Sequence, residues 1–384
     1  MAPPVIDFRN ADDPRDVVHR AVQALAEGKL VAFPTETVYG LAASALNESA
    51  VAKLSRIKDR KPGQPFTLAV KSAEEALDYV PALSSVAQRL ARRCWPGPIT
   101  IVLKDDHPDS LVKQLPATVQ AAISPNGTVG MRVPAHQILL AVLRLTAGPI
   151  ILTSANRSGD PEAMTADEVV QSLGDDVDLV IDDGRAKFGQ PSSVVQVDGN
   201  RLEFLRAGVI NEPTLKRLTS MMVLFVCTGN TCRSPMAELL MQQRIADHLG
   251  CKISELEDRG FMVMSAGIAA MMGGRASTEA VDVLGEKGLD LSHHESQPLG
   301  DRLVRFADHI FTMTRGHREA ILAQWPDAEP RTRLVCRDRR DVSDPIGGPP
   351  ELYRRCAEQI DEQLAGWMTE IDLSAIPTAE ETGE

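Results

Sequence analysis

Residues 226–235 read VCTGNTCRSP, and they place a cysteine, a glycine-containing loop and an arginine directly before the expected start of a helix. The apolar run 223–226 is typical of a buried strand, and Pro235 is a residue favoured in the first turn of a helix. A parallel strand delivers the loop that follows it to the sheet edge where ligands bind. The segment therefore predicts a strand, a loop and a helix of a parallel α/β sheet, with an anion site at the amino end of the helix.

The residue types in this loop suit attack on a phosphate group. Backbone amides between Thr228 and Arg233 can surround a phosphate, and the helix end together with Arg233 would favour the thiolate form of Cys227. Arg233 can hold two phosphate oxygens at once, Ser234 can donate to the thiolate, and Asn230 tolerates left-handed backbone. The alternative is a buried cysteine at a strand end, followed by a surface arginine.

Length and composition set the class of protein. A chain of 384 residues with 43% apolar and 24% charged residues predicts two globular domains. No apolar run approaches the roughly 20 residues of a membrane span, and the opening residues show no secretory signal, so we expect a cytoplasmic protein. The six cysteines lack Cys-x-x-Cys spacing, so no metal site is expected. The net charge of -12 argues against an extended nucleic-acid surface, and therefore against direct tRNA binding.

Hydrophobic patterning predicts two α/β domains, at residues 5–210 and 222–370, with a linker at 211–221 and a loose acidic tail at 371–384. Met221 and Met222 resemble a second start, as in a fusion of two proteins. In the first domain, strands are expected at 30–33, 67–70, 99–103, 130–133, 150–153, 179–182, 193–197 and 202–206, and helices at 15–27, 50–57 and 138–145. In the second, strands are expected at 223–226, 261–265, 309–312 and 333–334, and helices at 235–249, 277–287, 317–324 and 350–368. The first pattern predicts a mixed sheet, and the second a doubly wound parallel sheet.

Residues 222–368 resemble the low-molecular-weight protein tyrosine phosphatase family. The resemblance is carried by VCTGNTCRSP, by SAG at 265–267, by AD at 307–308 and by SDPIGG at 343–348. It implies a phosphocysteine intermediate on Cys227, a phosphoryl group held by Arg233, and Asp344 first as proton donor and then as the base for water, with no cofactor. On its own, an aspartate before a proline reads equally well as a turn residue. The implied phosphate loop comprises Thr228, Gly229, Asn230, Thr231, Cys232 and Ser234.

Two loop residues refine this expectation. Thr231 stands where typical tyrosine-directed members carry a bulky aliphatic residue, and CTGNTCRSPMAE resembles the bacterial protein-arginine phosphatases. A threonine hydroxyl can hydrogen-bond a guanidino group, and the aromatic residues that grip phosphotyrosine near Asp344 are missing. We therefore expect a phosphorylated protein as substrate, with phosphoarginine favoured over phosphotyrosine; the alternative is a neutral exchange at Thr231. The family also implies a reversible disulfide between Cys232 and Cys227, although Cys232 equally suits inert packing.

Polar clusters lie at several loop ends of the first domain: TETVYG at 35–40, KDRK at 58–61, TSANRSG at 153–159, PSSVV at 191–195 and LRAG at 205–208. Cations and hydroxyls of this kind suit a triphosphate and a small polar substrate, although a single KDRK is more often a solvated helix end. In this order, PTETVYGLA, KDR, WPGPITIVL, GMRVP, TSANRSG and PSSVV…LRAG resemble the YrdC/Sua5 threonylcarbamoyl-AMP synthases over residues 13–210.

That resemblance implies that L-threonine, bicarbonate and ATP, with Mg²⁺, give threonylcarbamoyl-AMP and pyrophosphate for a tRNA threonylcarbamoyl transferase complex. It places threonine at Thr37, Arg132 and Ser192, with Arg132 facing the carboxylate and Tyr39 lining the pocket. It places the nucleotide at Lys58, Arg60, Thr128, Ser154, Asn156 and Arg206. Two features depart from archaeal Sua5: a histidine is replaced near Ala69, and the phosphatase-like segment stands where the carboxyl-terminal Sua5 domain is usual.

Three other hypotheses compete with a bifunctional enzyme. The first domain could be an RNA-binding module, which the acidic balance disfavours. It could transfer carbamoyl groups in hydrogenase maturation, but the Cys-x-x-Cys finger segments of that system are missing. The second domain could be an idle phosphate sensor, which the intact Cys227, Arg233 and Asp344 argue against. A bifunctional synthase and phosphatase is therefore the expectation.

Overall fold

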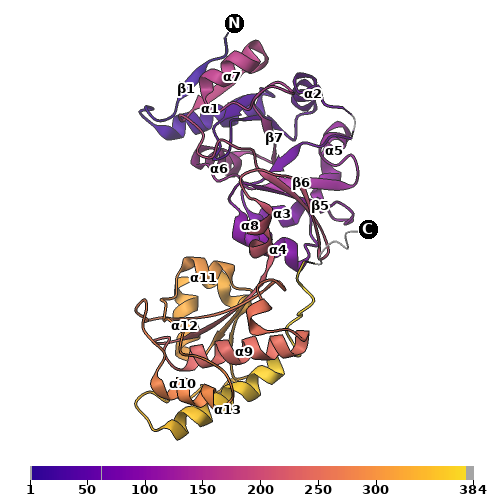
Figure 1. Ribbon diagram of the computed structural model, residues 1–384. Helices are drawn as coiled ribbons and strands as arrows, with labels where there is room; N and C mark the ends of the chain where they lie inside the picture. Colours follow the sequence, from indigo (N-terminus) through magenta and orange to yellow (C-terminus); the bar gives the residue numbers. More distant parts are fainter. Residues whose placement is uncertain (1, 62, 378–384) are drawn as a thin grey trace. The chain divides into compact units, whose positions relative to one another are not determined.

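The computed structural model describes residues 2–61 and 63–377, and these divide into two compact units between Leu218 and Thr219 (Figure 1). The predicted α/β class is confirmed in both units. Residues 378–384 of the expected acidic tail lie outside the described residues.

The first unit is built on a ten-stranded mixed sheet with the order β1-β8-β2-β3-β7-β4-β6-β5-β9-β10. Its strands are β1 (Val5–Asp7), β2 (Val31–Phe33), β3 (Gly40–Ser44), β4 (Thr67–Ala69), β5 (Ile99–Lys104), β6 (Thr128–Arg132), β7 (Ile150–Ser154), β8 (Leu179–Asp182), β9 (Ser193–Asp198) and β10 (Arg201–Arg206). Its helices are α1 (Pro14–Ala26), α2 (Glu48–Ile57), α3 (Ala73–Tyr79), α4 (Ser85–Cys94), α5 (Ala117–Ile123), α6 (Gln137–Leu145), α7 (Ala166–Leu173) and α8 (Glu212–Thr219), with 3-10 turns at Leu111–Gln114 and Gly174–Asp176.

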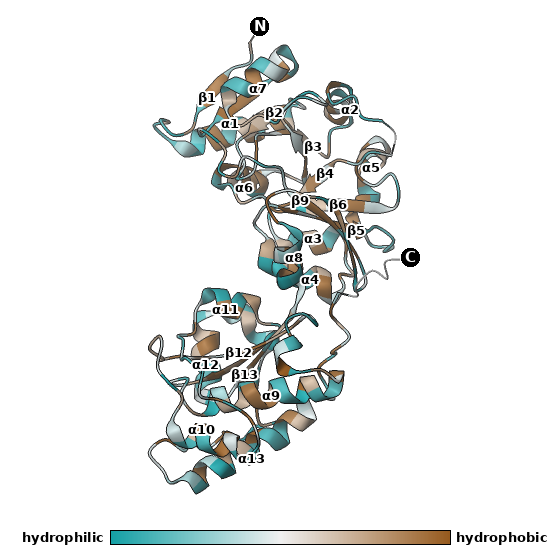
Figure 2. Ribbon diagram, viewed as in Figure 1, coloured by the Kyte–Doolittle hydropathy of each residue, from teal (hydrophilic) through white to brown (hydrophobic). Residues whose placement is uncertain are grey.

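Apolar side chains cover both faces of this sheet. Along β3, Ala42 faces the core that α1 and α6 form, whereas Leu41 and Ala43 face the core that α2, α4, α5 and α7 form. Alternate residues of a strand point to opposite faces, so two helix layers enclose the sheet. The strands are accordingly coloured mostly towards the hydrophobic end, whereas the helices mix both colours (Figure 2).

Several helices begin at a polar capping residue. Asn47 accepts a hydrogen bond from the backbone of Ala50 at the start of α2, and Ser72, Ser84 and Thr165 cap α3, α4 and α7 in the same way. A side-chain oxygen at this position satisfies one of the free amides of the first turn. Helices α3, α4, α5 and α7 were not anticipated, although serine or threonine caps three of them.

Residues 211–221 differ from the expected linker, because they hold α8 and the first residue of β11. The side chain of Asn211 accepts from the backbone of Thr214 at 3.0 Å, and Leu215 is 1% exposed within the core of the first unit. Burial of an apolar side chain on one helix face stabilises a short helix that would be marginal in isolation. The segment is therefore ordered structure and is packed on the first unit.

The second unit is a four-stranded parallel sheet with the order β12-β11-β13-β14, as predicted for a doubly wound fold. Its strands are β11 (Met221–Cys227), β12 (Phe261–Gly267), β13 (His309–Thr312) and β14 (Thr332–Leu334). Its helices are α9 (Arg233–Leu249), α10 (Thr278–Gly285), α11 (Asp301–Phe306), α12 (Arg315–Gln324) and α13 (Pro350–Trp367), with 3-10 turns at Ile253–Glu255 and Pro326–Arg331.

Strand β11 runs through the centre of this unit and is buried along its whole length. Val223 and Phe225 face the core built with α9, α10 and α13, whereas Leu224 and Val226 face the core built with α11 and α12. A strand that is buried on both faces ends at Cys227, so the loop that follows it lies at the carboxyl edge of the sheet.

The described part of the expected loose tail is packed. Ile371 and Ala375 are buried in the core beside α13, which corrects the expectation for residues 371–377. Their apolar side chains, within a stretch otherwise rich in acidic residues, account for this docking. Within residues 2–61 and 63–377, none of the helices combines the length and the apolar character needed to cross a membrane.

Candidate active sites

A cavity of about 370 Å³ collects most of the polar motifs of the first unit. The pairing of Gly40 with Ser154 brings the end of β7 beside the loop that precedes β3, and Arg132 ends β6, which β4 separates from β7. The predicted residues that line this cavity are Thr37, Tyr39, Lys58, Arg60, Arg132, Ser154, Asn156, Ser192 and Arg206. They come from distant parts of the chain, and the strand order brings them together.

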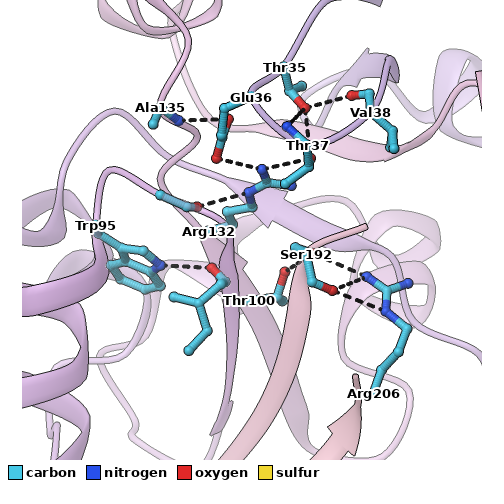
Figure 3. Close-up of polar contacts among 12 residues, drawn as sticks. Thr35, Glu36, Thr37, Val38, Trp95, Thr100, Arg132, Ala135, Ser192 and Arg206 are labelled. Atoms are coloured by element: carbon cyan, nitrogen blue, oxygen red, sulfur yellow. Dashed lines mark hydrogen bonds and ion pairs between the residues drawn. The ribbon is translucent and has the colours of Figure 1, made fainter. Parts of the chain in front are cut away.

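The guanidinium of Arg132 is held by the carboxylate of Glu36, a residue to which the sequence assigns no role. Its Nη2 donates to Oε1 of Glu36 at 2.7 Å and to Oγ1 of Thr37 at 3.0 Å, and its Nε donates to the carbonyl of Gly97 at 3.2 Å (Figure 3). The other carboxylate oxygen of Glu36 accepts from the backbone of Ala135 at 3.0 Å. Among the described residues, the hydrogen bonds of Arg132 thus use Nε and Nη2, which leaves Nη1 for a ligand.

The loop before β3 is a tight hydroxyl-rich turn. Oγ1 of Thr35 donates to the carbonyl of Val38 at 2.6 Å, accepts from the backbone of Thr37 at 3.1 Å, and lies 2.8 Å from Oγ1 of Thr37 (Figure 3). Tyr39 anchors the end of the turn, because its hydroxyl donates to the carbonyl of Gly184 at 2.7 Å. Burial, with Asp182 nearby, raises the pKa of Tyr39, so the phenol stays protonated.

Lys58 lines the same cavity and is fixed by three polar partners of its Nζ. Its Nζ donates to the carbonyl of Ser154 at 3.0 Å and to Oδ1 of Asn156 at 3.0 Å, and Oγ of Ser154 donates to the same Oδ1 at 2.6 Å. Burial, and then the neighbouring Arg60, lower the pKa of Lys58 to about 8. An anion bound beside this ammonium would be favoured, because it would offset both effects.

Two guanidinium groups complete the cation set. Arg60 lies over the ring of Phe66, with 4.6 Å between its Cζ and the ring centroid, and its buried Nε has no hydrogen-bond partner within the described residues. Nη2 of Arg206 donates to the carbonyl of Ser192 at 2.7 Å and to its hydroxyl at 3.1 Å (Figure 3). Burial lowers the pKa of both guanidinium groups, and Arg206 adds to the effect on Arg60. A buried donor without a partner next to crowded cations is the environment that a phosphate group satisfies.

Thr128 is not brought together with the other predicted residues. It opens β6 opposite Lys104, four residues before Arg132, and it is not among the described residues that line the cavity. Four residues of a strand span about 13 Å, which accounts for the separation. Thr100 lines the cavity instead, with its hydroxyl 3.1 Å from that of Ser192, and it belongs to the WPGPITIVL motif (Figure 3).

In the second unit, the loop after β11 wraps around the sulfur of Cys227. The hydroxyl of Ser234 lies 2.9 Å from Sγ, and the backbone amide of Asn230 donates to Sγ at 3.2 Å. Asn230 has a φ of 55°, a left-handed conformation that asparagine adopts more readily than most residues. The loop thus presents a backbone amide and a hydroxyl to the sulfur.

The side chain of Asn230 braces the loop. Nδ2 donates to the hydroxyls of Ser234 at 3.0 Å and of Ser265 at 2.8 Å, and Oδ1 accepts from the backbone of Gln297 at 2.9 Å. Ser265 in turn donates to Oε2 of Glu238 at 2.5 Å. Burial raises the pKa of Glu238 to about 7. Glu238 ends the CTGNTCRSPMAE motif, but the sequence indicates no role for it, because its partner Ser265 lies 27 residues further along the chain.

Arg233 and Asp344 meet at the mouth of this loop. Nη2 of Arg233 donates to Oδ2 of Asp344 at 2.5 Å, and Nη1 donates to the carbonyl of Val342 at 3.3 Å. The side chain of Arg233 is 6% exposed, whereas that of Asp344 is 45% exposed. The carboxylate can therefore turn towards solvent or a leaving group, while the buried guanidinium is held by Val342.

His317 is a second residue that the motifs did not indicate. Its Nε2 lies 2.9 Å from Oγ1 of Thr228, and its buried Nδ1 has no partner within the part of the chain that the structure describes. Burial, and then Arg233, lower the pKa of His317 to about 4. The imidazole is therefore neutral beside the phosphate loop at ordinary pH.

The loop also fixes Thr231 and Cys232. The carbonyl of Thr231 accepts from the backbone of Ser277 at 2.9 Å, and its hydroxyl lies 3.6 Å from Sγ of Cys232. That sulfur lies 3.4 Å from the hydroxyl of Ser277 and 3.8 Å from that of Tyr353, and Cys227 and Cys232 are both free thiols. In residues 2–61 and 63–377, no group of three or more His, Cys, Asp or Glu side chains is placed to hold a metal ion.

These features define two enzyme-like sites, a cation-lined cavity on a mixed sheet and a thiol in a phosphate loop on a parallel sheet. The family model Sua5_yciO_yrdC, described as telomere recombination, matches residues 23–208. The model of low molecular weight phosphotyrosine protein phosphatase matches residues 222–375.

Relatives match each half separately. The chain is 38% identical to the threonylcarbamoyl-AMP synthase of Pyrococcus abyssi over 173 residues, 45% of this chain and 48% of that protein. It is 31% identical to a putative threonylcarbamoyl-AMP synthase of Methanocaldococcus jannaschii, over 54% of this chain and 93% of that protein. The chain thus spans about half the length of the first relative and nearly all of the second. A solved structure of a double variant of P. abyssi Sua5, 23% identical with a TM-score of 0.50, covers 81% of this chain and 98% of that chain and shows a shared fold.

The second half is 38% identical to the protein-arginine-phosphatase of Geobacillus stearothermophilus, over 36% of this chain and 88% of that protein. The chain therefore belongs to two families: its first unit is a Sua5/YrdC domain, and its second is a low-molecular-weight phosphotyrosine phosphatase domain.

Proposed function

We propose that the first unit joins L-threonine, bicarbonate and ATP into threonylcarbamoyl-AMP, with release of pyrophosphate. The observation that carries this proposal is the ring of cations around one cavity, in which the buried Nε of Arg60 lacks a partner and Arg132 keeps Nη1 free of hydrogen bonds to the described residues. The names of the P. abyssi and M. jannaschii relatives support the same activity.

The two ends of the cavity suit different parts of the reactants. Nη1 of Arg132, with the hydroxyl of Ser192, offers donors to the carboxylate of threonine, and the hydroxyl of Thr37, which accepts from Nη2, helps to hold the guanidinium in place. Lys58, Arg60 and Arg206 suit the triphosphate, with Ser154 and Asn156 holding Lys58 in place. Among the described residues that line the cavity, the carboxylate is that of Glu162, and one carboxylate is a weak site for a free metal ion. We therefore propose that Mg²⁺ enters bound to the phosphates of ATP, whose charge it would help to neutralise.

The proposed chemistry needs no covalent intermediate on the protein. The amine of threonine bonds to the carbon of bicarbonate with loss of water, and an oxygen of the resulting carbamate attacks the α-phosphorus of ATP. The bond from that phosphorus to the bridging oxygen breaks, and pyrophosphate leaves with the electron pair. Lys58 and the arginines contribute by fixing the reactants and by stabilising the negative charge that builds on pyrophosphate. We further propose that the product passes to a tRNA threonylcarbamoyl transferase complex.

The test is pyrophosphate release by the purified chain. Release should require L-threonine and bicarbonate together, and the adenylate should be found by mass spectrometry. Pyrophosphate release that is unchanged when either reactant is omitted would contradict the synthase assignment.

We propose that the second unit hydrolyses phosphorylated protein side chains through a phosphocysteine, with phosphoarginine favoured. The observation that carries it is the loop after β11: the Cys227 sulfur lies 2.9 Å from the Ser234 hydroxyl, and Arg233, the residue before Ser234, pairs with Asp344 at 2.5 Å. In the first step the sulfur bonds to phosphorus, the phosphorus–nitrogen bond breaks, and the leaving guanidino nitrogen takes a proton from Asp344. In the second, Asp344 accepts a proton from water, the hydroxyl bonds to phosphorus, and the thiolate leaves with inorganic phosphate released.

Two observations favour phosphoarginine over phosphotyrosine. The hydroxyl of Thr231 belongs to the loop around the sulfur, where it can accept or donate a hydrogen bond to a polar leaving group. The G. stearothermophilus relative is named a protein-arginine-phosphatase. The test is phosphate release from matched phosphoarginine and phosphotyrosine peptides; faster release from phosphotyrosine would contradict the preference.

A further inference from the structure

A second cavity, of about 710 Å³, lies in the second unit and has a lining that includes none of the phosphate-loop residues. Five arginines line it: Arg315, Arg318, Arg333, Arg337 and Arg339. Two lining glutamates, Glu319 and Glu370, leave three positive charges in excess. This concentration stands out in a chain whose net charge is -12, and neither proposed reaction uses it.

Ion pairs neutralise only part of the set. Three of the arginines have an acidic partner within 4 Å: Arg337 with Glu370 at 2.5 Å, Arg318 with Glu329 at 3.3 Å and Arg315 with Asp341 at 3.5 Å. Arg333 and Arg339 have no ion pair within the described residues. Two guanidinium groups are therefore free to bind a ligand that carries one or two negative charges.

The ring of Trp367 orders two of these side chains. The Cζ atoms of Arg333 and Arg337 lie 5.6 Å and 5.9 Å from its centroid, and its Nε1 is tied to the carbonyl of Val335 at 2.8 Å. A guanidinium group held against an aromatic face loses less freedom when it binds, and its donors stay available to a carboxylate. The cavity is thus arranged for an anion before any ligand arrives.

The cavity borders β14, and β13 lies between β14 and β11, the strand that ends at the phosphate loop. Leu334 is paired with Thr312, and Thr312 is paired with Val226, which directly precedes Cys227. Two strand spacings are about 10 Å. The chain then runs from Cys336 in the cavity wall to Asp344 in the proposed active site. An extended peptide advances about 3.3 Å per residue, so three to four residues connect the two places.

We propose that this arginine cavity binds acidic side chains of the phosphorylated protein, about three to four residues from the residue that loses its phosphate. The inference rests on the proposed phosphatase function and adds a substrate class to it. Carboxylates fit better than a nucleic acid, because a phosphate backbone needs an extended basic track, whereas three of these arginines are already paired with acids. The competing explanation is that arginines on the edge strand β14 only prevent pairing with other chains.

Arg333→Gln/Arg339→Gln in the full chain removes the two unpaired charges and leaves the phosphate loop untouched. The matched control is Arg259→Gln/Arg275→Gln, since both of these arginines are exposed and lie outside the lining. Each pair is made with and without Cys227→Ser, so that binding is measured without turnover. The probes are fluorescent phosphoarginine peptides with aspartate, or alanine, at the third and fourth positions from the phosphorylated residue.

We expect the parent chain to bind and hydrolyse the acidic peptide about tenfold better than the alanine peptide, because charge pairs at a partly exposed site contribute only a modest binding free energy. The Arg333/Arg339 variant should lose this preference and the control should keep it, while all turn over p-nitrophenyl phosphate equally. The inference is overturned if the Arg333/Arg339 variant still prefers the acidic peptide, or if the parent chain shows no such preference. A variant that keeps the preference and only gains self-association would support the edge-strand explanation instead. Displacement of the peptide by an oligonucleotide of equal charge at lower concentration would also overturn it. If the parent chain hydrolyses no phosphate ester or phosphoramidate, the phosphatase proposal is wrong. Peptide binding by the Cys227→Ser proteins would still decide the role of the cavity.

Discussion

Oε1 of Glu36 lies 2.7 Å from Nη2 of Arg132, and the two side chains are each 7% exposed. The pair joins a loop after β2 to the end of β6, and it fixes one edge of a guanidinium group whose other edge faces the cavity. A buried charge pair of this kind contributes little net stability, but removal of one partner leaves the other uncompensated. Its role is to orient Arg132, and the proposed threonine site depends on that orientation.

Glu36→Gln therefore tests the positioning of the threonine carboxylate. The amide keeps the shape but cannot hold the guanidinium as a charge partner, so Arg132 gains freedom to turn away. We expect the KM for L-threonine to rise about tenfold, which corresponds to about 1.4 kcal/mol, with little change in the KM for ATP. Glu74→Gln, on the exposed side of α3, serves as the control. Equal KM values for threonine in both variants would remove Glu36 from the site.

The lowered pKa of Lys58 gives the nucleotide site a pH dependence. The free ammonium loses its proton around pH 8, below the ordinary lysine value of 10.5, and a bound triphosphate should draw the proton back. Binding then takes up a proton above pH 8, so the KM for ATP should rise as pH increases through that value. Lys58→Arg stays charged throughout this range, and its KM should be flat from pH 7 to 9. A parallel rise in both proteins would assign the effect to another group.

His317 makes a prediction for stability. Its pKa is about 4 in the folded chain against 6.5 ordinarily, so the unfolded chain takes up a proton first as pH falls. The free energy of unfolding of the second unit should decrease between pH 6.5 and 4, by about 1–2 kcal/mol once solvent screening is allowed for. Calorimetry would measure this on the unfolding transition whose temperature rises when inorganic phosphate is added, because that transition belongs to the second unit. His317→Gln has no such proton to take up, and an equal loss of stability in that variant would contradict the prediction.

Thr231→Ile tests how the phosphate loop selects its substrate. Isoleucine removes a hydroxyl of the loop, which lies 3.6 Å from Sγ of Cys232, and adds an apolar branch. We expect kcat/KM for a phosphoarginine peptide to fall at least about tenfold, while that for a phosphotyrosine peptide holds or rises. Thr278→Ile, at the exposed start of α10, is the control. A preference for phosphotyrosine in the parent chain would leave Thr231 without a role.

Much of the fold followed from sequence patterns, because strong apolar periodicity marks β11, α9 and α13 directly. The short helices α3 and α4 begin at single serine caps, Ser72 and Ser84, and no prediction covers them, although the buried residues of α4 recur at helical spacing. Helix α8 stands where the sequence predicts a linker, because the burial of Leu215 depends on tertiary contacts that no local pattern encodes.

The site residues likewise fall into those that motifs indicate and those that only the structure reveals. The residues named from motifs gather at two places, with Thr128 as the exception. Glu36, Glu238 and His317 could not be assigned a partner from sequence, because each meets its partner only through the strand order or through a neighbouring helix. Glu36 lies inside the TETVYG motif, so its position was visible and its ion pair was not.

The two proposed active sites of this chain should work independently of each other, and paired assays of both activities test this independence. Pyrophosphate release that depends on L-threonine, and phosphate release from a phosphoarginine peptide, would be measured for the parent chain, Arg132→Ala and Cys227→Ser. We expect Arg132→Ala to lose the first activity and keep the second, and Cys227→Ser to do the reverse. Loss of both activities in a variant that still unfolds at the temperature of the parent chain would contradict the claim.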